Sequence, residues 1–405
     1  KNLKARGDVE SWLGEVETAM RMTLWAKMKE GILDYTQRER IEWLKVTGDC
    51  EHKGGHPGQI VATGAQIMWT RRCEENLASD DPVGANSEYH KEIMKDIGDL
   101  VVTVRGKLTK LQRRTIGALV TTDVHNSDVV ARMRDEKVDR VGSFTWQMQL
   151  RYYWEKDASF RGEDCLVKMS NATFLYGYEY MGCTTRLVIT PLTDRCWLCI
   201  TGAGHIKRGA APAGPAGTGK TESSKDLAKA MGLFCVVFNC SDQIDYIMIA
   251  KLFSGLAQAG CWTCLDEFNR IQIEVLSVVA QMMIVLKNGM AAGKKTMVFM
   301  GRTIKLSPHI VIVTMNPGYA GRTELPDNLK VCFRPVAMLV PDYALIAEII
   351  LFSEGFDGAR NLARKMVNLY KLSAEQLSQQ RHYDYGLRAV ISVLKMAGAL
   401  KRGNP

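Results

Sequence analysis

Eight consecutive residues, Gly214 to Thr221, match every fixed position of the phosphate-binding pattern G-x-x-x-x-G-K-[ST]. Three glycines among them let the backbone turn tightly, so that successive N–H groups face inward and form an anion site where a helix begins. Lys220 is predicted to reach the β- and γ-phosphates of a nucleoside triphosphate, and the Thr221 hydroxyl to bind Mg²⁺. The alternative is a Gly- and Pro-rich surface turn, because the bare pattern also occurs by chance. The predicted phosphate loop consists of Gly214, Pro215, Ala216, Gly217, Thr218, Gly219, Lys220 and Thr221.

Two adjacent carboxylates, Asp266 and Glu267, end an apolar segment that begins at Cys261 and is predicted to be a strand. Ligands of open α/β sheets bind at the carboxyl ends of strands. Asp266 is therefore predicted to hold the Mg²⁺ shell beside Thr221, and Glu267 to polarise the water that attacks the γ-phosphate. The alternative is an ordinary solvated strand end. A phosphate loop about 45 residues upstream favours the catalytic interpretation.

Two further side chains could complete such a site. Asn316 follows the apolar segment 310–314, and its amide could bind both a γ-phosphate oxygen and the attacking water. The sequence Asn-Pro-Gly also favours a turn, so the alternative is that Asn316 only helps to form a turn. Arg388 opens the last helical pattern and could reach the phosphates if that part of the chain folds over the site. Exposed helix arginines are common, so spacing alone leaves its role open.

These side chains need a parallel sheet to bring them together. Strands are predicted at 234–238, 261–265, 310–314 and 336–340, helices from 220 and at 246–257 and 273–286, and a hairpin at 296–306. Short continuous apolar strands separated by helices indicate an α/β fold, with a parallel sheet covered on both faces. From residue 341 the pattern is helical again.

The residues before the loop show a different pattern. Apolar residues recur every three or four positions from Val9 to Ile32, which predicts an amphipathic helix with Asp8 as N-cap. Aromatic and β-branched residues from Phe174 to Ile189 predict short strands or a hairpin and mark a boundary. Further helical patterns cover residues 60–77, 88–111 and 124–138. We therefore expect an α-helical body of about 160 residues without a catalytic constellation of its own.

Composition excludes several classes of protein. Of the 405 residues, 46% are hydrophobic and 24% charged, and no apolar run approaching the ~20 residues needed to cross a bilayer is evident. The net charge of +9 comes from Lys and Arg mixed evenly with Asp and Glu, which argues against nucleic-acid binding. Eleven scattered cysteines fit a reducing compartment. The pairs Cys196/Cys199 and Cys261/Cys264 lie too far apart for a usual zinc site. The abrupt ends suggest a piece of a larger protein.

Longer sequence segments resemble those of the AAA+ ATPases, and in particular the first AAA+ module of dynein heavy chains. The residues in these segments are most similar to the axonemal type. The segments are Leu187 to Cys196, Gly214 to Glu222, Val237 to Ser241, Asp266 to Arg270, Glu274 to Val278, Met315 to Arg322 and Glu324 to Lys330. The resemblance covers essentially residues 140–405 and extends weakly to 57–60 and 121–130. It implies an AAA+ P-loop module preceded by an α-helical linker: linker 1–185, large α/β subdomain 186–340 and small helical lid 341–405.

The resemblance also implies a role for each candidate site residue, with ATP and Mg²⁺ as cofactors. The implied site residues are Lys220, Thr221 and Glu222 in Walker A, Asp266 and Glu267 in Walker B, Asn316 as sensor 1, Arg388 as sensor 2, and Pro191, Leu192 and Thr193 in a loop against adenine. Arg334 occupies the place of an arginine finger, which acts on a neighbouring module. The finger for this site would come from the next module of the same heavy chain.

By the same resemblance, the chain is the ATP-hydrolysing motor module of an axonemal dynein heavy chain, in which lid closure drives a swing of the linker. Implied partners are the remaining AAA+ modules, the microtubule through a stalk that this chain lacks, and dynein intermediate and light chains, without nucleic acid or membrane. The implied location is the cytoplasm and cytoskeleton, in the axoneme of cilia or flagella. Two alternatives remain: a scaffold that holds nucleotide without hydrolysis, which Glu267 and Asn316 argue against, and a non-motor AAA+ remodelling ATPase.

Overall fold

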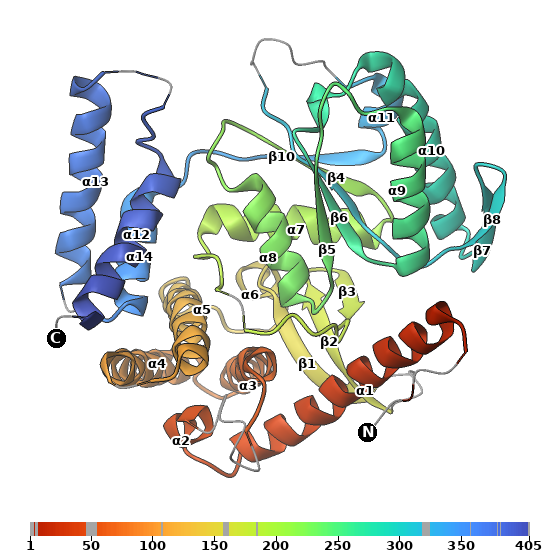
Figure 1. Ribbon diagram of the computed structural model, residues 1–405. Helices are drawn as coiled ribbons and strands as arrows, with labels where there is room; N and C mark the ends of the chain where they lie inside the picture. The colour runs from red at the N-terminus through yellow and green to blue at the C-terminus, as the bar shows by residue number, and fades with distance from the viewer. Residues whose placement is uncertain are drawn as a thin grey trace.

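The computed structural model describes residues 4, 7–45, 55–106, 108–156, 162–183, 185–317, 325–356, 358–378, 380 and 382–403. Both chain ends, the loop around Cys50 and the motif residues Gly318 to Arg322 lie outside the described residues. Figure 1 shows three parts: an N-terminal body (residues 7–183), a central body built on the large sheet (185–340), and a C-terminal helical bundle (341–403).

The N-terminal body is mainly helical, as expected, and also contains a small antiparallel sheet. Its helices are α1 (Val9–Tyr35), α2 (Arg40–Lys45), α3 (Gly58–Leu77), α4 (Pro82–Arg105), α5 (Lys110–Asp135) and α6 (Phe144–Gln147). The sheet has the order β1 (Arg151–Lys156), β2 (Glu163–Met169) and β3 (Ala172–Leu175). Strands β1 and β2 were not predicted. Of the strands expected between Phe174 and Ile189, only the last two residues of β3, Phe174 and Leu175, are in a strand. Helix α5 begins earlier than predicted because Thr109 and Gln112 form a capping box there.

The central body contains the predicted parallel sheet covered on both faces. Its five strands have the order β10 (Phe333–Ala337), β4 (Gly209–Ala213), β9 (Val311–Val313), β6 (Trp262–Asp266) and β5 (Cys235–Asn239), and all neighbours are parallel. The covering helices are α7 (Pro191–His205), α8 (Lys220–Ala230), α9 (Tyr246–Ala259) and α10 (Ile273–Ala291). Shorter elements are the 3₁₀ turn η1 (Phe268–Arg270), the hairpin β7 (Thr296–Phe299) and β8 (Arg302–Lys305), and α11 (Asp327–Lys330).

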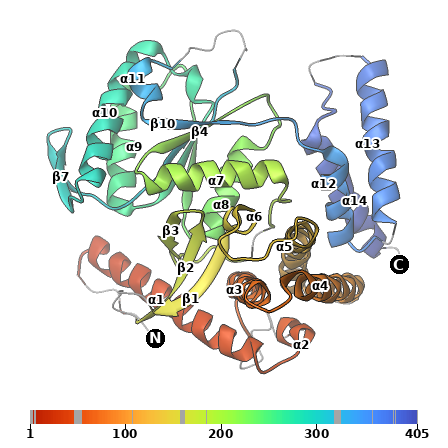
Figure 2. The same cartoon turned by 180° about the vertical axis from the view of Figure 1, so that it is seen from behind.

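Alternate residues of each strand enter two different cores, which explains why these strands read as continuous apolar runs. Val311 and Val313 pack with α9 and α10, whereas Ile312 packs with α7, α8 and residues of the N-terminal body. Both faces of the sheet are therefore buried. The second face is covered jointly by the central helices and by the N-terminal body, as the view from behind in Figure 2 also shows.

Two strand predictions need correction. Strand β4 was not predicted, because its Gly, Ala and Pro residues lack the β-branched or aromatic side chains typical of strands. Strand β10 begins three residues before the predicted 336–340 and contains Pro335. Proline has no N–H to donate, and β10 is an edge strand, where that loss is tolerated.

Helix α10 corrects the statement about apolar runs. Its 19 residues are long and apolar enough to cross a membrane by length and composition. In the fold this helix covers the sheet, and Leu276, Val279 and Leu286 are among its side chains in the core. Such a core helix passes the same test, so the result does not indicate a membrane span.

The N-terminal body holds the carboxyl end of α8, the helix that starts at the phosphate loop. The Tyr152 hydroxyl donates a hydrogen bond of 3.0 Å to the carbonyl oxygen of Ala230. The backbone N–H of Gly177 donates to Met231 O at 2.9 Å, and that of Glu179 to the next carbonyl at 3.0 Å. Helix α8 is thus fixed at the end opposite the loop.

The C-terminal bundle consists of α12 (Tyr343–Ser353), α13 (Ala359–Gln376) and α14 (Leu387–Gly403), and it leans against the N-terminal body (Figure 1). Helix α12 packs against α5. The carbonyl oxygen of Gly355 accepts hydrogen bonds from Arg105 Nε at 3.1 Å and from Lys401 Nζ at 2.9 Å. The bundle also contacts the central body, because Ile346 and Ile349 of α12 form an apolar cluster with Val188.

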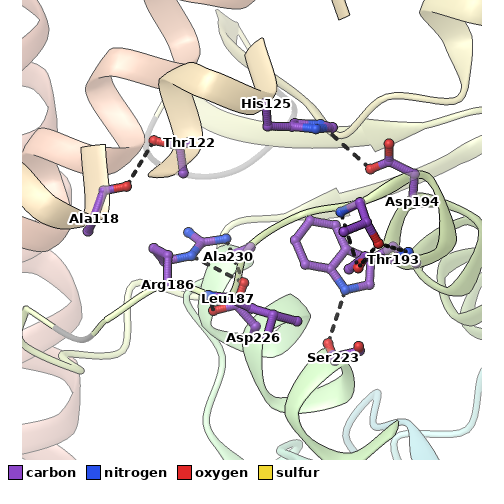
Figure 3. Close-up of polar contacts among 12 residues, drawn as sticks. Ala118, Thr122, His125, Arg186, Leu187, Thr193, Asp194, Ser223, Asp226 and Ala230 are labelled. Atoms are coloured by element: carbon purple, nitrogen blue, oxygen red, sulfur yellow. Dashed lines mark hydrogen bonds and ion pairs between the residues drawn. The ribbon is translucent and has the colours of Figure 1, made fainter. Parts of the chain in front are cut away.

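We expect the buried ion pair between Arg186 and Asp226 to be important for stability. The Arg186 Nη2 to Asp226 Oδ2 distance is 3.1 Å, and the two side chains are 13% and 4% exposed (Figure 3). Asp226→Ala should lower the free energy of unfolding by about 3 kcal/mol, because it leaves a buried guanidinium without its counter-charge. Urea denaturation followed by tryptophan fluorescence measures the change. Asp327→Ala, which alters a 98% exposed side chain, should change it by less than about 0.5 kcal/mol; equal effects would contradict the prediction.

Candidate functional site

The phosphate loop joins β4 to α8 and has the backbone conformation that its glycines permit. Gly217 and Gly219 have φ values of +76° and +81°, a region that residues with a Cβ rarely adopt. A Cβ on Gly214 would lie 2.1 Å from the carbonyl oxygen of Met338. The loop therefore needs glycine at all three positions, for two different steric reasons.

The Lys220 side chain points back into the loop. Its Nζ donates hydrogen bonds to the carbonyl oxygens of Gly214 at 2.9 Å and Pro215 at 2.6 Å. Burial lowers the pKa of this ammonium, Asp266 and Glu267 act in the opposite direction, and Arg388 lowers the pKa further. The contribution of Arg388 means that the C-terminal bundle brings this arginine within electrostatic range of the loop.

Asp266 lies at the carboxyl end of β6, directly beside the first turn of α8. Its Oδ1 accepts a hydrogen bond of 2.6 Å from the Thr221 hydroxyl and another from the Thr314 hydroxyl. The prediction that Thr221 and Asp266 are neighbours is thus confirmed by geometry. Two oxygen ligands side by side next to a phosphate loop are the donor set that Mg²⁺ uses, since it binds few protein groups and keeps water and phosphate oxygens.

Glu267 has an uncommon backbone conformation, with φ at +53°. Its N–H donates to the Thr314 hydroxyl at 3.1 Å, and its Oε2 lies 2.8 Å from Arg270 Nη1. The Asn316 amide nitrogen donates to Glu267 Oε1 at 3.4 Å. The left-handed residue turns the chain, so that the adjacent carboxylates of Asp266 and Glu267 have different hydrogen-bond partners.

Thr314 is a site residue that the sequence analysis missed. Its hydroxyl binds the Asp266 carboxylate and the Glu267 N–H, so it fixes both predicted Walker B residues. A usable signal existed, because this polar residue ends the apolar segment 310–314 just before Asn316. The pairing of β9 with β6 brings this hydroxyl to the two carboxylates.

Asn316 is 9% exposed and lies next to Glu267. Within the described part of the chain, its Oδ1 is buried without a hydrogen-bond partner. Buried polar atoms normally find a partner, so this amide oxygen is suited to bind a group of a ligand or an ordered water. Its position fits the prediction that it would bind phosphate or the attacking water.

The adenine-contacting residues predicted at Pro191, Leu192 and Thr193 form the first turn of α7 instead of a loop. Thr190 and Thr193 form a capping box that starts the helix. Helix α7 is tied to α8 because the indole N–H of Trp197 donates to the carbonyl oxygen of Ser223 at 3.0 Å.

The next residue in the first turn of α7, Asp194, faces the N-terminal body. Figure 3 shows it opposite His125 of α5, whose Nε2 lies 3.6 Å from Asp194 Oδ1. Burial raises the pKa of the Asp194 carboxyl, and the charges of His125 and Arg132 act against this. The start of α7 is thus held from both sides, by α8 and by α5.

A cavity of about 470 Å³ begins beside the first turn of α8, at Glu222. Its wall at this end includes Val188, Ile346 and Leu387, which belong to one apolar cluster together with Val124 of α5. A flat apolar base could pack against such a surface. These residues come from four distant segments and have no common sequence pattern, so they could not be predicted as one surface.

The two arginines singled out by sequence lie in different places. Arg388 is exposed in the first turn of α14, and its charge influences Lys220. Arg334 lies on β10, paired in register with Ala210 near the amino end of β4, whereas the phosphate loop follows the other end of that strand. This position agrees with the expectation that Arg334 does not serve this site.

The structure supports no metal site built from the cysteine pairs. Within the described ranges, no group of three or more His, Cys, Asp or Glu side chains could hold a metal ion. Burial raises the pKa of the Cys196 thiol to about 12, which keeps it protonated at neutral pH.

Comparisons with known proteins agree with the geometry. Residues 176–405 match a family described as the hydrolytic ATP binding site of dynein motor region. The chain is 54% identical over 408 residues to human dynein axonemal heavy chain 6, covering 100% of this chain and 10% of that protein. It is 51% identical over 399 residues to mouse dynein axonemal heavy chain 1, covering 98% and 9%. It is 46% identical over 402 residues to the Chlamydomonas reinhardtii dynein-1-beta heavy chain of the flagellar inner arm I1 complex, also covering 98% and 9%. The chain thus spans about a tenth of the length of these relatives.

Proposed function

Because this chain belongs to the dynein heavy-chain family and contains its hydrolytic ATP-binding region, we propose that it is an ATP-hydrolysing motor module of an axonemal heavy chain. The observation that carries the proposal is the meeting of Lys220, Thr221, Asp266, Glu267 and Asn316 at one end of the parallel sheet. These side chains come from three separate segments and have the chemical types that phosphoryl transfer needs.

In this proposal the triphosphate lies in the loop from Gly214 to Thr221, with Glu222 following it. Lys220 exchanges its contacts with the loop carbonyls for phosphate oxygens. The negative charge of these oxygens opposes the lowering of the Lys220 pKa by burial. Thr221 and Asp266 would hold Mg²⁺, which neutralises charge on the β- and γ-phosphates. The support for this placement is the hydrogen bond that already joins the two side chains.

Glu267 is the proposed water-polarising base. Its carboxylate lies beside the Asn316 amide, so one water could contact both groups next to the γ-phosphate. Arg388 would add positive charge from the C-terminal bundle, which makes hydrolysis sensitive to the position of the bundle. We propose that the adenine ring of ATP packs against the first turn of α7, with Pro191, Leu192 and Thr193, and against the apolar cluster at Val188.

For the whole heavy chain, we propose that the N-terminal body is the C-terminal part of the linker, that residues 186–340 are the large subdomain, and that the C-terminal bundle is the lid. The partners of this module would be the further AAA+ modules of the heavy chain, one of which supplies an arginine finger. The heavy chain itself would bind the microtubule and dynein intermediate and light chains. Its place would be the axoneme of cilia or flagella. These proposals rest on the relatives, which are axonemal or flagellar dynein heavy chains.

Single-turnover phosphate release tests hydrolysis against mere nucleotide holding. The complete heavy chain, mixed in excess over γ-labelled ATP, should release labelled phosphate much faster than it releases intact ATP, because Glu267 and Asn316 are placed to activate water. A chain that binds ATP tightly and returns it unhydrolysed would support the scaffold alternative. Tight binding of nucleic acid at moderate salt would instead favour a remodelling ATPase.

A further inference from the structure

A small cavity lies between the N-terminal body and the start of α7. Its volume is about 30 Å³. The residues that line it include Trp69 of α3, Gln149 in the segment before β1, and Asp194 in the first turn of α7. None of these three residues is more than 5% exposed. The cavity therefore lies in a buried contact between two of the three parts of the molecule.

Each of these three side chains has one buried polar atom without a hydrogen-bond partner among the described residues. The atoms are Trp69 Nε1, Gln149 Oε1 and Asp194 Oδ2. Their other polar atoms are engaged: Gln149 Nε2 donates to Thr145 O at 3.1 Å, and Asp194 Oδ1 faces His125 Nε2 at 3.6 Å (Figure 3). Buried polar atoms normally have a partner, so three such atoms around one cavity point to a bound group.

The chemistry of the three atoms defines that group. The Trp69 indole N–H can only donate a hydrogen bond, whereas the Gln149 amide oxygen and the Asp194 carboxylate oxygen accept. A metal cation cannot accept from the indole, and a chloride ion cannot donate to the oxygens. Water can do both. A water molecule needs at least ~10–15 Å³, which this cavity offers, whereas organic ligands occupy sites of ~300–1,000 Å³.

We propose that a buried water molecule occupies this cavity and joins the N-terminal body to α7. The water accepts a hydrogen bond from Trp69 Nε1 and donates one each to Gln149 Oε1 and Asp194 Oδ2. Three bonds are typical of a buried water. Asp194 thus contacts the N-terminal body in two ways, at His125 of α5 and through the water at Trp69 and Gln149.

The water site also concerns the nucleotide. Pro191, Leu192 and Thr193 directly precede Asp194 in the first turn of α7, so the water would tie the proposed adenine contact to the N-terminal body. A water-mediated contact can break and re-form without repacking of side chains. Only this consequence rests on the proposed function; the water site itself does not.

A structure of the complete heavy chain without nucleotide, at a resolution that shows its other buried waters, tests the site directly. We expect a density peak within about 3.2 Å of all three atoms. An empty cavity in such a map, or a peak that contacts only one of the two parts, would overturn the proposal. A peak at about 2.4 Å or less from both oxygens would also overturn it, because those are metal-ion distances.

Hydrogen–deuterium exchange of the complete heavy chain tests whether the water holds α7. Gln149→Met keeps a side chain of similar length but removes the acceptor, so exchange of the α7 amides should become at least about threefold faster. The bond from Gln149 to Thr145 O is lost as well, but it joins two residues of the N-terminal body and does not reach α7. Unchanged or slower exchange in α7 would contradict the bridge.

Thr122→Val is the matched control. Thr122 lines the same cavity, but its hydroxyl already donates to the carbonyl oxygens of Ala118 and Leu119 (Figure 3). This variant removes no group that binds the water, so α7 exchange should change by less than about 1.5-fold. Equal acceleration in both variants would mean that any change in the cavity loosens α7, and the water bridge would be wrong.

These measurements separate the water site from the ATPase proposal because they are made without nucleotide. A heavy chain that shows the water and responds to Gln149→Met, but does not hydrolyse ATP, would sink only the ATPase proposal. Normal ATP turnover together with a dry cavity would sink only the water bridge.

Discussion

Replacing Glu267 by Gln in the complete heavy chain should reduce ATP turnover at this site by at least about 100-fold while leaving ATP affinity within a few-fold. A carboxamide keeps the shape of the side chain and its contact with Asn316, but it cannot accept a proton from the attacking water. Lys220 and Thr221 make their hydrogen bonds with the loop carbonyls and with Asp266, so ATP binding should depend chiefly on groups other than Glu267. Steady-state phosphate release and binding of a fluorescent ATP analogue measure the two effects.

A matched control separates catalysis from a general change of charge. Glu274→Gln removes an exposed carboxylate from the first turn of α10, a few residues farther along the chain, and should leave turnover unchanged. If Glu267→Gln hydrolysed ATP at the normal rate with the other modules inactivated, the assignment of the base would be wrong. An equal loss in both variants would point to a structural effect.

Replacing Lys220 by Ala should weaken ATP binding by about 100-fold, which corresponds to roughly 3 kcal/mol. Charge-assisted hydrogen bonds to phosphate are each worth about 1.5–3 kcal/mol, and Lys220 is the buried cation of the loop. Equilibrium titration with a fluorescent ATP analogue measures the loss. Turnover at low ATP concentration should fall in parallel.

Lys225→Ala is the control for this second variant. Lys225 lies five residues farther along α8 and pairs with Glu222 on the surface, so its loss should change ATP affinity by less than about twofold. Circular dichroism of both variants checks that α8 remains folded. Normal ATP binding by a folded Lys220→Ala protein would remove the phosphate loop from the proposal.

The chemical identity of the site could be predicted from sequence because its residues lie in short local patterns. The loop from Gly214 to Thr221 carries its own backbone requirements, and Asp266 and Glu267 follow an obvious apolar strand. The α/β pattern places Asp266 and Glu267 at the carboxyl end of a parallel strand and the loop at the start of a helix, which are the two places where such sheets bind phosphates. The contact between Thr221 and Asp266 confirms that reasoning.

What could not be predicted depends on contacts between distant segments. Strand β4 has a composition typical of a loop and becomes a strand because β10 and β9 pair with it on either side. The apolar cluster of Val188, Ile346 and Leu387 has no local signature. Strand β1, by contrast, contains Tyr152, Tyr153 and Trp154, and this aromatic run is a local signal typical of a strand.

The double attachment of α8 has a mechanical consequence. The helix has eleven residues, so it is only about 16 Å long, and a rod of that length bends very little. Its first residue is Lys220, and its last turn is clamped by Tyr152 and the backbone of Gly177. We therefore expect a shift at the phosphate end of α8 to move the residues that hold its other end, which lie in β1 and directly after β3.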